Sequence, residues 1–256
     1  MKSRLRVSMG IYQAYAPLYD LSGQTAFSQR MLPYLRRLLT CHVVDGKRMV
    51  DVACGTGTVG LGLAEDGWCV YGVDASRDML AAARAKAQGK RASVTWSRQD
   101  MRAFNLPQRV HLATCLYDSM NYMLTEDDLK ACFTCVFDVL LPGGLFLFDM
   151  NTIKALCEVW NGKNYVVDSD DLYVVLRSRY SRRQERSYVE VNCFQRVGTF
   201  YRRVTEEHVE QGYPKEQINA LLTEAGFAVE AAYECFSFQP PSDETLRIMW
   251  AARRPR

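Results

Sequence analysis

The sequence predicts an α/β protein whose core is a mostly parallel sheet. From residue 49 to residue 150, apolar runs of strand length alternate with segments that carry apolar residues at helical spacing. A glycine-rich turn, Gly55–Gly60 (GTGTVG), separates the first apolar run from the first helical segment. Acidic residues lie at the ends of the first three runs, at Asp51, Asp74 and Asp100. Strands that alternate with helices form parallel sheets with right-handed crossovers, so these carboxylates should meet beside one edge of the sheet.

The order of the elements follows from the same alternation. The expected strands are Met49–Ala53, Cys69–Val73, Val94–Ser97, His111–Leu116 and Leu145–Asp149, and the expected helices are Val59–Asp66, Asp78–Gln88 and Asp127–Leu140. Pro142-Gly143-Gly144 should end the third helix and turn the chain into the fifth strand. Pro214 should open a later helix, and Ala228–Phe236 and Leu246–Ala252 should be the last two strands.

The charge of the glycine-rich turn helps to choose its ligand. A strand that runs into such a turn and then a helix is typical of nucleotide-binding sites, and glycines at 55 and 57 let the backbone approach a ligand closely. Asp51 lies four residues before Gly55. A carboxylate there would repel a pyrophosphate, but it would suit a ligand with an ammonium and a sulfonium group. This favours S-adenosylmethionine (SAM) over a nicotinamide dinucleotide.

The next two strand ends support that choice. Asp74 lies seventeen residues after Gly57, where a carboxylate can accept hydrogen bonds from both ribose hydroxyls. Asp100 and Met101 follow the third strand. There the carboxylate can accept from an adenine amino group while the next backbone N–H donates to a ring nitrogen. Three acidic residues in this order are more specific than the glycines alone.

Five stretches of the chain resemble the successive motifs of the class I SAM-dependent methyltransferases. They are VDVACGTG, VYGVDASRDML, RQDMRAFNLP, ATCLYDSMNYML and LLPGGLFLFDMNT. The chain is most similar to the small-molecule branch, with the glycine and amino-sugar N-methyltransferases and a bacterial subgroup of that branch. The resemblance implies a Rossmann-like sheet of seven strands with the last strand antiparallel, SAM as cofactor and S-adenosylhomocysteine (SAH) as product. The residues expected to contact the cofactor are Tyr12, Tyr19, Asp51, Ala53, Gly55, Asp74, Ala75, Met79, Asp100, Met101, Leu116 and Tyr117.

The N-terminal and inserted segments are expected to enclose the cavity. We divide the chain into an N-terminal helical cap (1–40), a SAM-binding core (41–150), an inserted antiparallel β lid (151–212), and a helix with two strands that complete the core (213–256). In the resembled family a tyrosine-rich cap closes over SAM, so Tyr12 or Tyr19 could bind its carboxylate. The alternative is that these tyrosines only pack the cap onto the sheet.

The lid combines β-type sequence with many arginines. The expected lid strands are Tyr165–Val167, Leu172–Arg179, Tyr188–Gln195 and Phe200–Val204, and they follow the fifth core strand. Residues 177–203 hold eight arginines against Glu185 and Glu190. These arginines could bind an anionic molecule or RNA, but they also fit the solvated face of a small sheet. The absence of any known RNA-binding motif favours the second interpretation.

The nine cysteines are scattered and lie mostly in apolar segments, so we expect small buried side chains, a reducing compartment and no metal site. Only Cys132-x-x-Cys135 has redox or zinc spacing, and it lies in a helical pattern. The net charge of +3 is too small to indicate nucleic acid. Because no stretch is apolar for long enough to cross a membrane, and Met1–Val7 leads into no signal-peptide core, we expect a cytoplasmic protein.

Candidate catalytic residues follow the fourth strand and end the lid. Tyr117, Asp118, Asn121 and Tyr122 lie where the transferring methyl group is expected, and no Asn/Asp-Pro-Pro-Tyr/Phe motif of the nucleic-acid adenine N-methyltransferases occurs there. His208 is a candidate base, with Glu207 as its orienting partner. The alternative for this Glu-His pair is a surface ion pair. Of these candidates we take His208, Asp118 and Tyr122 as catalytic.

The sequence therefore predicts a methyltransferase that acts on nitrogen or oxygen of a small-molecule acceptor. Two alternatives stay open, an RNA methyltransferase that uses the basic insertion and a non-catalytic SAM-binding protein. An exposed lid sheet could also pair across a homodimer.

Overall fold

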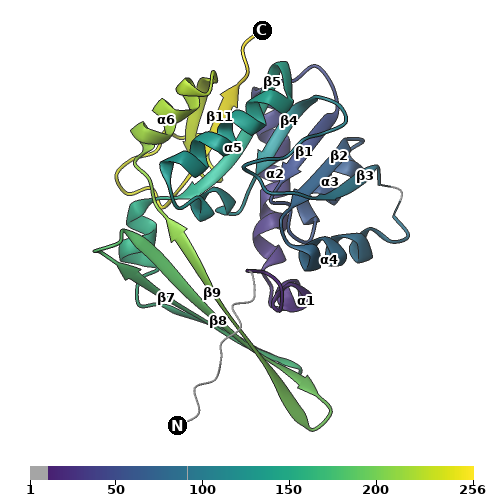
Figure 1. Cartoon of the computed structure of the whole chain (residues 1–256), viewed down its shortest axis with the longest axis vertical. Helices are drawn as coiled ribbons and strands as arrows, with labels where there is room; N and C mark the ends of the chain where they lie inside the picture. Colours follow the sequence, from purple (N-terminus) through teal and green to yellow (C-terminus); the bar gives the residue numbers. More distant parts are fainter. Residues whose placement is uncertain (1–10, 91) are drawn as a thin grey trace.

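The computed structural model describes residues 11–90 and 92–256. These residues form two sheets, one of seven strands in the order β10-β11-β5-β4-β1-β2-β3 and one of four strands in the order β6-β7-β8-β9. Figure 1 shows the first sheet as the core of the molecule and the second at one end of it, opposite to the end where the C-terminus lies. The predicted fold class is confirmed.

The core sheet is parallel except at one end. Its parallel strands are β1 (Arg48–Val52), β2 (Cys69–Asp74), β3 (Val94–Arg98), β4 (Val110–Cys115) and β5 (Leu140–Asn151). The strand β11 (Arg247–Arg253) runs antiparallel to both β5 and β10 (Ala228–Glu234). The last strand is therefore antiparallel to its neighbours, as expected.

Both faces of the core sheet are buried, because apolar side chains alternate between them. Phe146 and Phe148 of β5 belong to an apolar cluster with α5 (Glu126–Val139) and α6 (Lys215–Glu224). Leu145 and Leu147 belong to a second cluster, with α2 (Thr25–Cys41) and α3 (Thr58–Glu65). Helices on both faces give the sheet its three-layer form (Figure 1).

The strand β5 begins five residues earlier than the sequence predicts. The Pro142-Gly143-Gly144 segment does not form a separate turn, because it pairs with the chain that follows β11. The Gly143 N–H donates to the Arg254 carbonyl at 2.9 Å, and the Arg254 N–H donates to the Gly144 carbonyl at 2.8 Å. Gly143 has a φ of +79°, a conformation that glycine adopts without strain.

Two helices of the core, α4 (Arg77–Ala87) and α5, begin at capping side chains. Ser76 Oγ accepts from the Met79 N–H at 3.2 Å at the start of α4. Thr125 Oγ1 accepts from the Asp128 N–H at 3.1 Å at the start of α5. Such caps satisfy backbone donors that have no partner within the helix. Between β4 and α5 the chain forms a short 3-10 helix, η1 (Ser119–Tyr122).

The second sheet is the lid that the sequence predicts after β5. Its antiparallel strands are β6 (Asn164–Asp168), β7 (Leu172–Ser181), β8 (Arg186–Val197) and β9 (Phe200–Gln211), and η2 (Ala155–Val159) links it to β5. Leu172, Val174 and Val191 of this sheet pack with Tyr15 and Leu18 of the N-terminal segment, which includes α1 (Ala16–Tyr19). The lid and the described part of the predicted cap therefore share one apolar cluster. Residues 1–10 of that cap lie outside the described residues.

Two other sequence-based expectations concern cysteines and membranes. Cys132 is fully buried on α5, and Cys135 contacts the Phe104 carbonyl through Sγ at 3.0 Å, so this pair packs α5 against the core. Within residues 11–90 and 92–256, the helices are too short or too polar to cross a membrane.

Candidate active site

A cavity of about 630 Å³ lies beside the carboxyl ends of the core strands. All twelve residues that the sequence predicts as cofactor contacts line it: Tyr12, Tyr19, Asp51, Ala53, Gly55, Asp74, Ala75, Met79, Asp100, Met101, Leu116 and Tyr117. Tyr122 also lines this cavity. The other two candidate catalytic residues, Asp118 and His208, lie behind its wall with little exposed surface.

The glycine-rich turn is held open toward the cavity. Asp74 Oδ2 accepts from the Gly55 N–H and Asp74 Oδ1 from the Ser76 N–H, both at 2.8 Å. Gly55 has a φ of +53°, and a Cβ placed on it would meet no atom within 4 Å. A Cβ on Gly57, whose φ is +75°, would lie 2.4 Å from the Trp96 ring. Gly57 therefore serves packing, while Gly55 leaves space for a ligand.

Asp51 brings an ionisable group to the floor of the cavity. Its side chain is almost completely buried and accepts from Thr114 Oγ1 at 2.7 Å. Burial raises the pKa of Asp51 to about 7, although hydrogen bonds from Thr114 and the Gly60 N–H oppose the shift. A cationic ligand group beside it would favour the charged form of this carboxyl.

The carboxylate of Asp100 already accepts hydrogen bonds from within the protein, which the sequence does not suggest. Arg102 donates to it from its guanidinium at 2.6 Å and from its backbone N–H at 2.9 Å. These contacts, first of all the side-chain hydrogen bond, lower the pKa of Asp100. An adenine amino group would share this carboxylate with Arg102, which also binds Asp128 at 2.7 Å.

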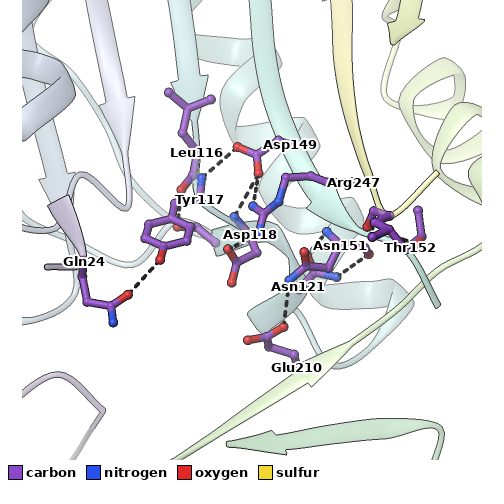
Figure 2. Close-up of polar contacts among 12 residues, drawn as sticks. Gln24, Leu116, Tyr117, Asp118, Asn121, Asp149, Asn151, Thr152, Glu210 and Arg247 are labelled. Atoms are coloured by element: carbon purple, nitrogen blue, oxygen red, sulfur yellow. Dashed lines mark hydrogen bonds and ion pairs between the residues drawn. The ribbon is translucent and has the colours of Figure 1, made fainter. Parts of the chain in front are cut away.

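The loop after β4 has an unusual backbone. Tyr117 and Asp118 have φ values of +61° and +52°, and such left-handed conformations cost about 1–3 kcal/mol for residues other than glycine. Asp149 holds both, because its carboxylate accepts from the Tyr117 N–H at 2.8 Å and the Asp118 N–H at 3.2 Å. Figure 2 shows this carboxylate between the loop and Arg247. Strain that neighbouring groups hold in place is typical of functional sites.

Comparisons with known proteins decide the class of the chain. Residues 49–144 match the family model described as a methyltransferase domain. The chain is 28% identical over 249 residues to the putative methyltransferase YqeM of Bacillus subtilis, with 96% of this chain and 98% of that protein covered. A solved structure of a SAM-dependent methyltransferase from Clostridium acetobutylicum has a TM-score of 0.83 at 25% identity, and it covers 96% of this chain and all of that one. The chain is a SAM-dependent methyltransferase.

Another relative is named as an amino-sugar N,N-dimethyltransferase. The methyltransferase is 28% identical over 228 residues to the dTDP-3-amino-3,6-dideoxy-α-D-glucopyranose N,N-dimethyltransferase of Streptomyces fradiae. The match covers 84% of each chain.

The residues of the cavity fit SAM. Asp74 and Asp100 offer carboxylate oxygens, Asp51 offers a buried carboxyl for the cationic part, and Gly55 leaves open space at the turn. Tyr19 Oη forms no hydrogen bond within the described part of the chain, so it is available to the methionine carboxylate. Tyr12 Oη contacts Tyr122 Oη at 2.9 Å instead. The individual roles of these residues stay predictions.

Behind the loop after β4, two carboxylates of the methyltransferase contact one guanidinium, and a third carboxyl group lies near enough to interact with them through its charge. Arg247 of β11 donates to Asp118 at 2.9 Å and also to Asp149 (Figure 2). Its guanidinium lies over the Phe27 ring at 4.6 Å. Glu210 of β9 accepts from Asn151 Nδ2 at 3.3 Å. We call Asp118, Asp149, Glu210 and Arg247 the acidic cluster.

Two carboxyl groups of the acidic cluster have raised pKa values. Burial raises the pKa of Asp118 to about 6, with Arg247 opposing and Asp149 adding to the shift. Burial and the charge of Asp118 raise the pKa of Glu210 to about 8. Near neutral pH the cluster therefore has an excess of negative charge and a carboxyl, Glu210, that holds its proton.

The predicted partner of His208 is wrong. The side chains of a strand alternate between its two faces, so Glu206 and Glu210 share the buried face of β9 with His208. Glu207 lies on the other face, where it is exposed and lines the cavity. His208 Nε2 lies 3.3 Å from Glu206 Oε2, and Glu207 lies 3.7 Å from Arg179. His208 Nδ1 contacts Tyr122 Oη at 2.9 Å, so the histidine meets the cavity only through Tyr122.

Sequence reasoning missed Glu206, Glu210 and Arg247. The alternation of buried residues continues from Val204 through Glu206, His208 and Glu210, but charged residues on the inner face hide it. For this reason the predicted fourth lid strand ended at Val204 instead of Gln211. Asn121, a further candidate, is also structural, since its Nδ2 donates to the Gln211 carbonyl at 2.8 Å and so ties η1 to the end of the lid.

Proposed function

We propose that this enzyme transfers the methyl group of SAM to a nitrogen or oxygen atom of a small-molecule acceptor, and that an amine nitrogen is the preferred acceptor atom. The observation that carries the amine preference is the acidic cluster, where two carboxylates, Asp118 and Asp149, share a single cation, Arg247. An excess of carboxyl groups attracts an ammonium group and repels a phosphate or carboxylate.

SAM supplies a methyl group that is already activated for displacement. The residues of the chain therefore need only to align the acceptor and, for a charged amine, to take up its proton. In this proposal Tyr12 and Tyr122 contact the acceptor, since both line the cavity. Asp118 acts through its charge from behind the loop.

The size and closure of the site support a small acceptor. The cavity lies in the range of small-molecule sites, and the N-terminal segment and the lid strand β9 border it. Four of the eight lid arginines are engaged within the protein: Arg179 with Glu207, Arg186 with the Leu124 carbonyl, Arg196 with Asp171 and Arg203 with Asn192. The Streptomyces fradiae relative is named for methylation of an amino sugar, which agrees with an amine.

An acceptor panel tests the proposal. The purified enzyme is incubated with SAM and, separately, with amino-sugar nucleotides, amino acids, phenols and transfer RNA, and SAH is measured by mass spectrometry. We expect SAH and a methylated product with one or more amines. Turnover of phenols or RNA without any amine would contradict the amine preference, and turnover of RNA would contradict the small-molecule proposal as well.

A further inference from the structure

The inward face of β9 carries ionisable groups that cofactor binding does not use. Glu206, His208 and Glu210 alternate along this strand and are all buried, with exposed fractions of 6%, 3% and 7%. Burial of a charged group costs free energy unless hydrogen bonds or an opposite charge compensate it.

Glu206 fixes the backbone of the N-terminal segment. Its Oε2 accepts from the Tyr12 N–H at 2.8 Å, and its Oε1 accepts from the N–H groups of Gln13, Ala14 and Tyr15 at 3.1, 2.8 and 2.9 Å. Burial opposes the charge of this carboxylate, but the contacts with His208, Tyr15 and Tyr12 outweigh it and lower the pKa of Glu206. Glu206 is therefore an anion that ties the lid to the N-terminal segment.

Tyr12 is held at three points. Its N–H donates to Glu206, its carbonyl accepts from Ser76 Oγ at 2.6 Å, and its hydroxyl contacts Tyr122. These contacts stabilise a φ of +56°, which is rare for a tyrosine. They also place the ring against His208, with the ring centroids 4.5 Å apart.

The hydroxyl groups form a chain that leads from the cavity to His208. Tyr12 Oη lies 2.9 Å from Tyr122 Oη, and Tyr122 Oη lies 2.9 Å from His208 Nδ1. Glu206 Oε2 lies 3.3 Å from Nε2 without hydrogen-bond geometry, and the negative charge of this carboxylate favours a proton on that nitrogen. His208 Nδ1 must then accept from Tyr122, and Tyr122 must accept from Tyr12. This direction leaves lone pairs of Tyr12 Oη free for a donor in the cavity.

We propose that Tyr12, Tyr122 and His208 form a relay that removes a proton from the acceptor amine, and that Glu206 positions this relay. The relay depends on the amine acceptor proposed above. The ammonium gives one proton to Tyr12 Oη, Tyr12 gives its own to Tyr122, and Tyr122 gives its own to His208 Nδ1. The amine becomes a neutral nucleophile, both tyrosines end neutral, and the imidazolium lies beside the Glu206 carboxylate.

Other groups that face His208 are compatible with this step. Glu206 and Glu210 flank it on its own strand, Asp118 acts on it from the loop after β4, and Tyr12 and Tyr122 contact it from the N-terminal segment and η1. Glu206 and Asp118 can both carry negative charge and stabilise a cation at His208.

The first experiment reads the proton positions without SAM or acceptor. The protein contains three histidines, so ¹⁵N-histidine labelling and a His208→Gln variant assign the His208 resonances. For the neutral imidazole we expect a proton on Nε2 and none on Nδ1. Glu206→Gln should mix the two tautomers, whereas Glu207→Gln, a matched change on the exposed face of β9, should leave them unchanged. A wild-type Nδ1 that carries the proton would overturn the relay.

The second experiment measures turnover of the amine that the acceptor panel identifies. Tyr122→Phe keeps the ring, breaks the relay and should lower kcat roughly a hundredfold, while the Kd for SAM changes less than about twofold. Tyr213→Phe is the control, because it also removes one hydroxyl contact, at 2.6 Å to the Met123 carbonyl, outside the relay. Equal kcat in both variants would overturn the relay. If no amine is methylated at all, the proposed function fails, and the tautomer measurement still decides the direction of the chain.

Discussion

The guanidinium of Arg247 and the carboxylate of Asp118 form an ion pair at 2.9 Å, although 129 positions separate them in the sequence. Arg247 also binds Asp149, the residue that holds the left-handed backbone of Tyr117 and Asp118. One cation of the last strand therefore stabilises both the shape and the charge of the loop after β4.

Removal of this cation should destabilise the protein strongly. Arg247→Met leaves two buried carboxylates without their ion-pair partner, which costs about 3–5 kcal/mol. Urea unfolding at pH 7 measures the loss. The control is Arg36→Met, which removes an exposed pair with Asp66 at 2.7 Å and should cost less than about 1 kcal/mol. Equal losses of unfolding free energy in the two variants would show that the buried ion pairs of Arg247 stabilise the protein no more than an exposed pair does.

Asp74 should carry a large share of cofactor affinity. Asp74→Asn removes a charged acceptor that lines the cavity, and hydrogen bonds to charged groups contribute about 1.5–3 kcal/mol, so SAM and SAH should bind roughly ten to a hundred times more weakly. Calorimetric titration measures both. Asp45→Asn, at an exposed residue paired with Arg256, should bind SAM like the wild type. Unchanged affinity in Asp74→Asn would remove this residue from the site.

Asp51 should make SAM binding depend on pH. The pKa of about 7 means that this carboxyl gains charge between pH 6 and pH 7.5, so SAM affinity should rise with pH by up to about tenfold per unit. Asp51→Asn should bind SAM more weakly at pH 7.5 and lose most of this dependence. Titrations at three pH values test it, and a wild-type profile as flat as that of the variant would exclude a role for its charge.

Glu210 should make stability fall as pH rises. Its folded-state pKa is raised to about 8, so its contribution is fully present below the unfolded pKa near 4.5 and is lost as pH rises through 8. Glu210→Gln cannot ionise. Relative to the wild type it should gain about 4 kcal/mol between pH 5 and pH 8.5, as measured by urea unfolding at both values. A matched exposed change, Glu207→Gln, should show no such gain.

The predicted cofactor contacts could be found from the sequence because each of them lies in a short local motif. Each strand that carries Asp51, Asp74 or Asp100 is a short apolar run, and the adjacent glycines and acidic residues lie within the same motif. Parallel topology alone brings these motifs together, so all twelve predicted contacts line one cavity.

The acceptor side depends on pairings that no local pattern encodes. Arg247 reaches Asp118 through the antiparallel pairing of β11 with β5, and Glu206 reaches the N-terminal backbone through the packing of the lid. From the sequence alone, a charged residue on the buried face of a strand cannot be distinguished from an exposed one, because its partner lies far away in the chain. This is why the sequence assigned Glu207 to His208, and why it left Glu210 out of the site.

The most direct test of the amine proposal compares two acceptors that differ in one group. At saturating SAM, the wild-type enzyme and Asp118→Asn are each given an accepted amine and its hydroxyl analogue, and methylated product is measured by mass spectrometry. We expect the wild type to methylate the amine at least tenfold faster than the alcohol, and Asp118→Asn to lose most of this preference. Equal methylation of both acceptors by the wild type would contradict the proposal.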